Sequence, residues 1–425
     1  MSDAVDVATH SGTASPTSGD RADCDAILKD LYSPAGRLDP YSRYAQLRKT
    51  APVHLTASGS VILTGYDDCA AVLRNPVMRT PDSDPQASTA PPGWQVRPAS
   101  RTIGESMLVR NPPEHTRLRR LVSGAFSPRR VMELAPDVQG LVDTCLDRVA
   151  DAGADGGTVN LRDLLAFPLP SAVIAAMLGI PESDWDWLIE PMADIVPALD
   201  LSVPEVALDR ADDAARLLLP YFGELAAARR ERPHEDLITA LVTARDGDQR
   251  LTEEELVPTI ILIYAAGFTT TVGLITNGVL PLLRSPEQLA LLRSDPTHTP
   301  AAVSEALRYD TPVQAVSRAP AEDVVIGGVA VPAGTKINPF LAAANRDPLH
   351  FPDPDRFDIT RTGGKGIGFG GGVHYCLGSA LARLEGEVVF RSLVERFPKL
   401  ALAGEPELSP EFNFRSYARV PVTVR

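Results

Sequence analysis

The sequence predicts a mainly α-helical protein with a small β region. Apolar residues recur in steps of three and four from Leu377 to Phe397, which indicates an amphipathic helix. Residues 251–280 form a long, nearly continuous apolar stretch, which indicates a buried helix. Alternating apolar residues occur only in short runs, such as 52–64, and these indicate short strands.

The composition is that of an ordinary globular protein, with 425 residues of which 44% are hydrophobic and 23% charged. The formal charge of −14 argues against nucleic acid as the main partner. The four cysteines lack the spacing of a disulfide framework or metal finger, which favours a reducing cytoplasm. We expect a disordered tail over residues 1–25 and no apolar run long enough to span a membrane.

The first elements after the tail are a hairpin and a helix. Residues 52–64 alternate around a Ser-Gly-Ser turn, and 66–74 read as a helix opened by two aspartates. The segment 77–101 is rich in Pro, Ser and Asp and has no periodic pattern. A loop of this length in a compact domain is usually functional or disordered.

A basic helix is predicted to begin near Pro112, with an acidic residue in its first turn. His115 and Arg119 are four residues apart and therefore share one face of this helix. Two cationic donors on one face suit a carboxylate ligand. A solvated basic face is the alternative, and this stretch by itself does not decide between them.

The long apolar helix begins with a capping-box pattern in which Thr252 faces Glu255. Gly267 lies in its middle, where a glycine often marks the close approach of another group. Thr270 can donate its hydroxyl hydrogen to the Ala266 carbonyl, four residues earlier. The alternative is that the threonines of this stretch simply pack in the core.

Further along, residues 302–309 read as a helix, and 324–331 and 336–339 read as strands. A glycine-dense loop over 366–372 then leads to Cys376, and a helix follows at once. A helix N-terminus favours the thiolate form of cysteine, which is the form that ligates metals. A buried structural cysteine in a turn is the alternative.

The motif Phe369-Gly370-x-Gly372-x-His374-x-Cys376-Leu377-Gly378 resembles the haem-ligand loop of the cytochrome P450 family. The resemblance covers nearly the whole chain from about residue 39. It implies the cytochrome P450 fold, with one haem domain over residues 26–425 that binds haem b. The implied metal ligand is the Cys376 thiolate, and the implied haem contacts in this loop are Phe369, Gly370 and Gly378.

Other segments resemble further parts of that family. The resemblance implies that haem propionates are bound by His115, Arg119, Arg318 and His374. It implies catalytic roles on the oxygen-binding helix for Ala266, Gly267, Thr269 and Thr270, with Ala266-Gly267 against the haem. It also implies a buried structural triad of Glu305, Arg308 and Arg356. One position departs from the family, because Thr269 stands where an acid usually relays protons.

The resemblance implies a monooxygenase that inserts one atom of O₂ into a small organic molecule by hydroxylation or epoxidation. A secondary metabolite such as a polyketide or macrolide, a terpenoid or a peptide is the expected substrate. Because no dinucleotide-binding unit is present, electrons are expected from a ferredoxin and its reductase. Basic residues that could contact this donor are Arg117, Arg120, Arg129, Arg130 and Lys365.

We expect a cytoplasmic monomer. The alternatives are an enzyme of the same fold that couples or desaturates its substrate without inserting oxygen, and a haem binder without activity. The departure at Thr269 favours the first alternative, whereas Ala266, Gly267 and Thr270 argue against the second.

Overall fold

The computed structural model describes residues 5–8, 18–81, 96–199 and 205–425. Contacts divide the chain into two compact units. Unit 1 comprises residues 1–88, 277–376 and 406–418, and unit 2 comprises residues 89–276, 377–405 and 419–425. Each unit is assembled from segments far apart in the sequence, so no single cut in the chain separates them.

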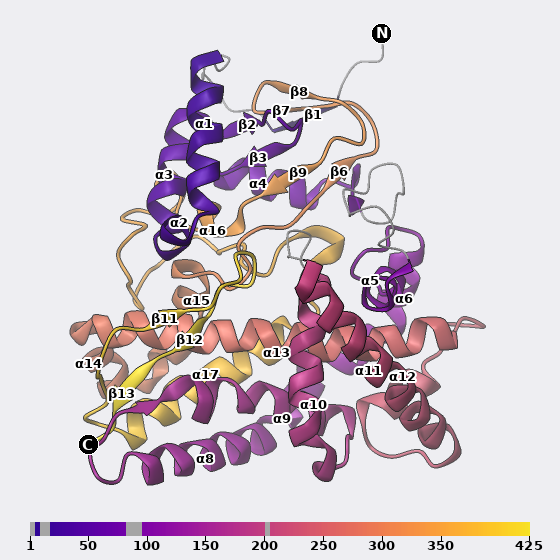
Figure 1. The fold of residues 1–425 in the computed structure, drawn as a ribbon, viewed down its shortest axis with the longest axis vertical. Helices are drawn as coiled ribbons and strands as arrows, with labels where there is room; N and C mark the ends of the chain where they lie inside the picture. Colours follow the sequence, from indigo (N-terminus) through magenta and orange to yellow (C-terminus); the bar gives the residue numbers. More distant parts are fainter. Residues whose placement is uncertain (1–4, 9–17, 82–95, 200–204) are drawn as a thin grey trace. The chain divides into compact units, whose positions relative to one another are not determined.

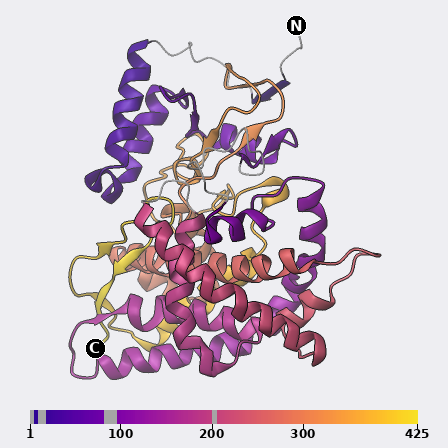
Figure 2. The same ribbon diagram turned by 45° about the vertical axis from the view of Figure 1, so that its right-hand side comes forward.

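Unit 1 contains short strands in small sheets (Figures 1 and 2). They are β1 (Val5–Ala8), β2 (Val53–Leu55), β3 (Val61–Leu63), β4 (Met78–Arg79), β6 (Ala319–Pro320), β7 (Val324–Ile326), β8 (Val329–Val331), β9 (Ile337–Pro339), β11 (Glu407–Leu408) and β12 (Tyr417–Arg419), whose last residue belongs to unit 2. The predicted hairpin is confirmed, because β2 and β3 pair antiparallel with Val53 opposite Leu63. β9 then pairs parallel with β3, with Val61 opposite Ile337.

Unit 1 also contains helices. They are α1 (Ser18–Leu31), α2 (Pro34–Leu38), α3 (Pro40–Thr50), α4 (Tyr66–Arg74), α14 (Pro286–Ser294), α15 (Thr299–Tyr309), α16 (Leu341–Ala344) and the 3₁₀ segments η6 (Pro296–His298) and η7 (Gly372–His374). Of these helices, α1 and α4 contact the strands of unit 1. α1 and α3 run side by side (Figure 1). Asp39 caps α3 by accepting a hydrogen bond from the Ser42 amide, and Pro40 supplies the first helical residue.

The predicted disordered tail is wrong for part of its length. β1 forms backbone hydrogen bonds with β7, where Val5 lies opposite Val324, and α1 already begins at Ser18. The distant strand β7 provides the partner that orders residues 5–8, and composition by itself cannot reveal such a partner. Residues 1–4 and 9–17 of the tail lie outside the described residues.

Unit 2 is mostly helical. Its elements include α5 (Pro98–Glu105), α6 (Glu114–Ser123), η3 (Gly124–Phe126), α7 (Pro128–Glu133), α8 (Ala135–Ala152), the π-helical η4 (Arg162–Ala166), α9 (Pro168–Leu178), α10 (Glu182–Ile195), η5 (Val196–Leu199), α11 (Glu205–Glu231), α12 (Leu237–Thr243) and α17 (Ser379–Arg396). A small sheet joins β10 (Ala401–Leu402), β13 (Pro421–Thr423) and β5 (Val159–Asn160). α8 and α17 lie side by side (Figures 1 and 2).

The predicted long apolar helix is α13 (Glu253–Arg284). Its start is capped as expected, because the Thr252 amide donates to the Glu255 carboxylate over 3.0 Å. Contrary to our expectation, this helix is long and apolar enough to cross a membrane. However, 78% of its most apolar window is buried inside the protein, as in the core helix of a globular fold.

Candidate active site

The glycine loop before Cys376 folds back on itself in unit 1. The Cys376 amide donates to the Phe369 carbonyl over 3.0 Å, which brings these two predicted site residues together. Gly370 and Gly372 have φ angles of 70° and 64°, which favour glycine. A Cβ atom at Gly372 would lie 2.2 Å from the Leu73 carbonyl oxygen of α4. The glycines therefore allow the loop to turn tightly against α4.

Cys376 differs from the other cysteines in its exposure. Cys24, Cys69 and Cys145 are buried, whereas Cys376 is partly exposed. Burial raises the pKa of Cys24 and of Cys145 to about 11 and that of Cys69 well above its usual value, so these thiols stay protonated at neutral pH. α17 begins at Ser379, three residues after Cys376, as the sequence predicted. Cys376 is therefore the accessible cysteine, and it directly precedes a helix.

Arg318, also in unit 1, is 8% exposed. Its Nη1 atom donates to the Ser317 carbonyl over 2.7 Å, and burial lowers its pKa to about 10. No carboxylate within the described ranges forms an ion pair with it. A buried cation without an anionic partner is costly, so this guanidinium is suited to receive a carboxylate. His374 is half-buried at the end of η7.

The basic helix is confirmed as α6 in unit 2. His115 is buried and Arg119 is half-buried, one turn apart on the same helix. Two other basic residues of α6 pair with acids of unit 2. Arg117 forms an ion pair with Glu255, and Arg120 donates to Asp246 over 2.6 Å. These pairs make Arg117 and Arg120 weaker candidates for an electron-donor contact than the sequence suggested.

The predicted hydrogen bond within α13 is present, because the Thr270 hydroxyl donates to the Ala266 carbonyl over 2.6 Å. This bond defines the segment that we call the Ala266–Thr270 turn. Ala266 is exposed, and Gly267, Thr269 and Thr270 are partly exposed, although residues 256–265 and 271–282 are buried. The helix thus presents one small, accessible face with two hydroxyl groups.

The side of Gly267 on which a Cβ atom would lie faces α9, and the predicted position of this glycine against the haem stays a prediction. A Cβ atom at Gly267 would lie 2.7 Å from the Ile174 Cδ1 atom of α9. Sequence reasoning missed Ile174, because a lone isoleucine in an apolar helix has no distinguishing pattern.

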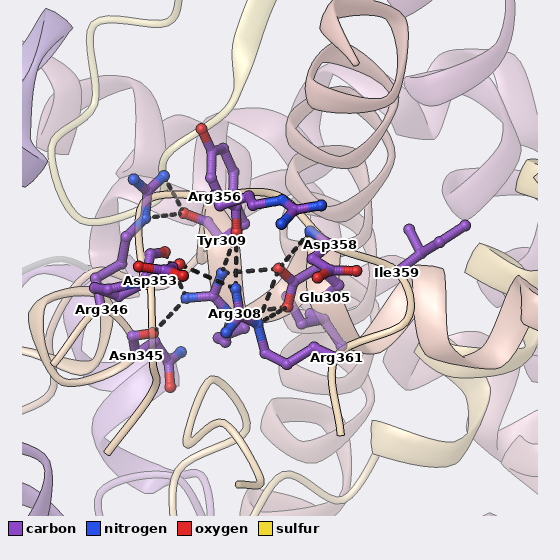
Figure 3. Close-up of polar contacts among 12 residues, drawn as sticks. Glu305, Arg308, Tyr309, Asn345, Arg346, Asp353, Arg356, Asp358, Ile359 and Arg361 are labelled. Carbon is purple, nitrogen blue, oxygen red and sulfur yellow. Dashed lines mark hydrogen bonds and ion pairs between the residues drawn. The ribbon is translucent and has the colours of Figure 1, made fainter. Parts of the chain in front are cut away.

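The buried triad in unit 1 has a different third member (Figure 3). Glu305 accepts two hydrogen bonds of 2.8 Å from Arg308, as predicted. The second cation beside Glu305 is Arg361, whose Nε atom lies 3.2 Å from it. The prediction of Arg356 is wrong, because its backbone carbonyl, not its guanidinium, joins the network by accepting from Arg308 and Arg361.

Residues 192–418 match the cytochrome P450 family. The chain is 39% identical to a biotin biosynthesis cytochrome P450 of Bacillus subtilis, over 91% of this chain and 96% of that protein. The chain belongs to the cytochrome P450 family. This P450 is also 40% identical to the 6-deoxyerythronolide B hydroxylase of Saccharopolyspora erythraea, over 88% of this chain and 93% of that protein.

Solved structures agree with this assignment. This P450 superposes on the crystal structure of P450BioI in complex with hexadec-9Z-enoic acid ligated acyl carrier protein with a TM-score of 0.85 and 38% sequence identity. The superposition covers 92% of this P450 and 100% of that chain. The mainly helical fold with small sheets is therefore the cytochrome P450 fold.

Members of the family are haem b monooxygenases, and this P450 is an enzyme of that class. Its residues fit the cofactor. The accessible Cys376 can supply a thiolate ligand, and the buried Arg318 guanidinium can bind a propionate carboxylate.

Proposed function

We propose that this P450 inserts one atom of O₂ into a secondary metabolite, by hydroxylation or epoxidation. The observation that carries the proposal is the glycine loop that presents Cys376 as the accessible thiol. The names of relatives support a small organic substrate, since they include a 6-deoxyerythronolide B hydroxylase and a nocardicin C N-oxygenase. A polyketide or macrolide, a terpenoid or a peptide fits this range.

In this proposal Cys376 is the iron ligand, and Phe369, Gly370 and Gly378 contact haem b beside it. The donors to the propionates are His115, Arg119, Arg318 and His374. When haem b is bound, its thiolate-ligated iron supplies the oxygen chemistry, in which one oxygen atom leaves as water and the other enters the substrate. These donors would hold the two carboxylates by charge-assisted hydrogen bonds.

The Ala266–Thr270 turn has the catalytic side chains of the proposal. Ala266 and Gly267 present at most one methyl group to the accessible face of this turn. The Thr270 hydroxyl can pass a proton on to oxygen and recover its bond to the Ala266 carbonyl afterwards. Because Thr269 cannot donate a proton as an acid does, we assign the relay to the two threonine hydroxyls together with water or a substrate hydroxyl.

Replacing Thr270 with alanine should increase the hydrogen peroxide released per NADPH consumed severalfold, toward the ceiling of one peroxide per NADPH, because loss of a proton-transfer group slows the productive step by about a hundredfold or more. The variant loses the hydroxyl but keeps a good helix former, so the fold should be unchanged. Peroxide and NADPH are measured together with ferredoxin and its reductase. Thr276→Ala is a matched control, because Thr276 makes the same bond to the Val272 carbonyl in a buried part of α13. Equal peroxide yields from the two variants would contradict the role of Thr270.

Replacing Arg318 with methionine should affect the haem-free and haem-loaded proteins in opposite directions. In the haem-free protein the buried guanidinium lacks a carboxylate, so its removal should raise the free energy of unfolding by about 1 kcal/mol. With haem bound, the loss of a propionate contact should speed haem transfer to apomyoglobin by about tenfold. Arg129→Met is the control, since the Arg129 side chain is 91% exposed. A haem-free variant less stable than the parent would argue against a carboxylate-binding role.

We further propose a ferredoxin and its reductase as electron donors, a monomeric state and a cytoplasmic location. Arg130 and Lys365 are exposed and form no ion pair within the described residues, so they are the basic residues best placed to meet an acidic donor. Reversing each charge should weaken ferredoxin binding at low salt and have little effect at high salt.

A second function, oxidative coupling or desaturation without oxygen insertion, is favoured by one residue and by one similar solved structure. Thr269 replaces the usual acid, and a solved P450 with 30% identity, CxnD, is described as an enzyme for C–S bond formation. An oxidative coupling or desaturation would abstract hydrogen and leave no oxygen in the product. Turnover under ¹⁸O₂ distinguishes the two functions, because only insertion labels the product.

The experiment that tests the proposed function has two steps. The reduced protein is mixed with carbon monoxide, and a strongly red-shifted Soret band is expected from thiolate ligation. A panel of polyketides, macrolides, terpenoids, peptides and fatty acids is then screened for spectral shifts, and binders are tested for oxidised products. A protein without the shifted band would refute the proposal.

A further inference from the structure

α9 contacts the back of the Ala266–Thr270 turn through one buried side chain. The Ile174 Cδ1 and Cγ1 atoms would lie 2.7 and 3.0 Å from a Cβ atom placed on Gly267. A side chain at position 267 would therefore require Ile174 to move. Ile174 is 1% exposed, and its β-branched side chain has a restricted χ1 that holds Cγ1 in place. Cδ1 can turn away by rotation about χ2 only where the packed interior leaves room for it.

Two further contacts join α9, or Phe167 directly before it, to α13 close to Gly267. The Ser171 and Tyr264 hydroxyls share a hydrogen bond of 2.7 Å, and both residues are buried. The rings of Phe167 and Phe268 pack edge to face with centroids 4.9 Å apart. Because Tyr264, Gly267 and Phe268 follow i, i+3, i+4 spacing, all three contacts lie on one face of the helix.

The opposite side of the same turn is the accessible one. Ala266 is exposed and Thr270 is partly exposed, and the hydrogen bond between them spans that surface. The contacts with α9 therefore help to fix the rotation and height of this short segment along α13. A shift of 1 Å in such a segment is enough to misplace a reacting group.

We propose that Ile174 is a positioning residue for the Ala266–Thr270 turn, and that Gly267 is a glycine because Ile174 occupies the space of its side chain. The inference rests on the proposed function, in which Thr270 passes a proton. It assigns to α9 a part in limiting the peroxide released for each NADPH consumed. The flanking Ser171–Tyr264 and Phe167–Phe268 contacts act in the same direction.

A double-mutant cycle on the purified P450 tests the proposal, with Gly267→Ala, Ile174→Ala and the combined variant. Gly267→Ala should lower Tm by about 1–3 °C, since overpacking the core is destabilising. The combined variant should regain most of this loss, because the new methyl group enters the space that Ile174 vacates. Gly223→Ala is the matched control in the middle of α11, where a Cβ atom would meet nothing within 4 Å. This control should leave Tm unchanged or raise it.

The functional readout is the peroxide released per NADPH with ferredoxin, its reductase and no added substrate. Gly267→Ala and Ile174→Ala should each raise it by about twofold or more, and the combined variant should return toward the parent value. If the loss of Tm in the combined variant equals the sum of the losses in Gly267→Ala and Ile174→Ala, residues 174 and 267 do not interact and the proposal is overturned. If the Tm changes of the three variants are non-additive but their peroxide yields equal that of the parent, the contact is structural only. That result would overturn the positioning role.

The outcomes also separate this inference from the proposed function. If the parent protein fails to give the thiolate Soret band, the proposed function fails and the positioning role fails with it. The Tm cycle would then still report whether Ile174 and Gly267 interact. If the thiolate Soret band is present and the Tm changes in the double-mutant cycle are additive, only the positioning role of Ile174 fails.

Discussion

Replacing Cys376 with serine should abolish the red-shifted Soret band of the reduced carbon monoxide complex and reduce turnover by at least about a thousandfold. Serine is nearly isosteric but remains protonated at neutral pH, so it cannot supply an anionic ligand of comparable softness. The loop should still fold, because the bonds that shape it are backbone bonds, such as that from the Cys376 amide to the Phe369 carbonyl. Absorption spectra and turnover with any substrate found by the screen measure both effects.

The control for this variant is a second cysteine. Cys145 is buried on α8, and burial raises its pKa to about 11. Cys145→Ser should leave the Soret band where it is, with at most a modest loss of stability from burying a hydroxyl group. A Cys376→Ser protein that kept the shifted band would show that another group ligates the iron.

Replacing Glu305 with glutamine should unfold or severely destabilise unit 1, with a loss of about 3–5 kcal/mol in the free energy of unfolding. Glu305 and Arg308 are 4% and 3% exposed, and Glu305 also accepts from Arg361 and from the Asp358 amide. A neutral amide leaves two guanidinium groups beside it without their anion (Figure 3). A loss of this size is a large part of the total stability of a typical protein.

The measurement is denaturant unfolding where enough protein folds, and otherwise the yield of soluble protein. Asp355→Asn is the matched control, because Asp355 pairs with Arg346 over 2.9 Å but its side chain is 75% exposed. It should change the free energy of unfolding by no more than about 0.5 kcal/mol. Equal effects of the two substitutions would mean that burial does not set the strength of the Glu305 pair.

Short-range patterns account for what the sequence predicted well. The bond from Thr270 to Ala266 follows from the four-residue period of a helix, and the Thr252–Glu255 cap follows from a local spacing. The tight loop before Cys376 follows from glycines at positions with positive φ. These features need only residues a few positions apart, so they can be deduced without knowledge of the rest of the chain.

The features that sequence reasoning got wrong or missed depend on distant segments. Arg361 rather than Arg356 stands beside Glu305, and β7 pairs with residues 5–8. Ile174 faces Gly267 from more than 90 residues away. In each case several residues of the same type could have made the contact, and only the packed structure selects one.

The sequence by itself therefore determined the thiolate candidate Cys376 and the hydroxyl of Thr270, because local backbone geometry and residue chemistry suffice for these. The family followed from the resemblance of the Cys376 motif to the haem-ligand loop. The tertiary structure decided which arginine balances the buried Glu305 and which helix supports the Ala266–Thr270 turn. It also buries Arg318 without an ion-paired carboxylate in the described part of the chain. Burial and close packing arise only when distant segments meet, and they set the energy of a charge or of a methyl group in the interior.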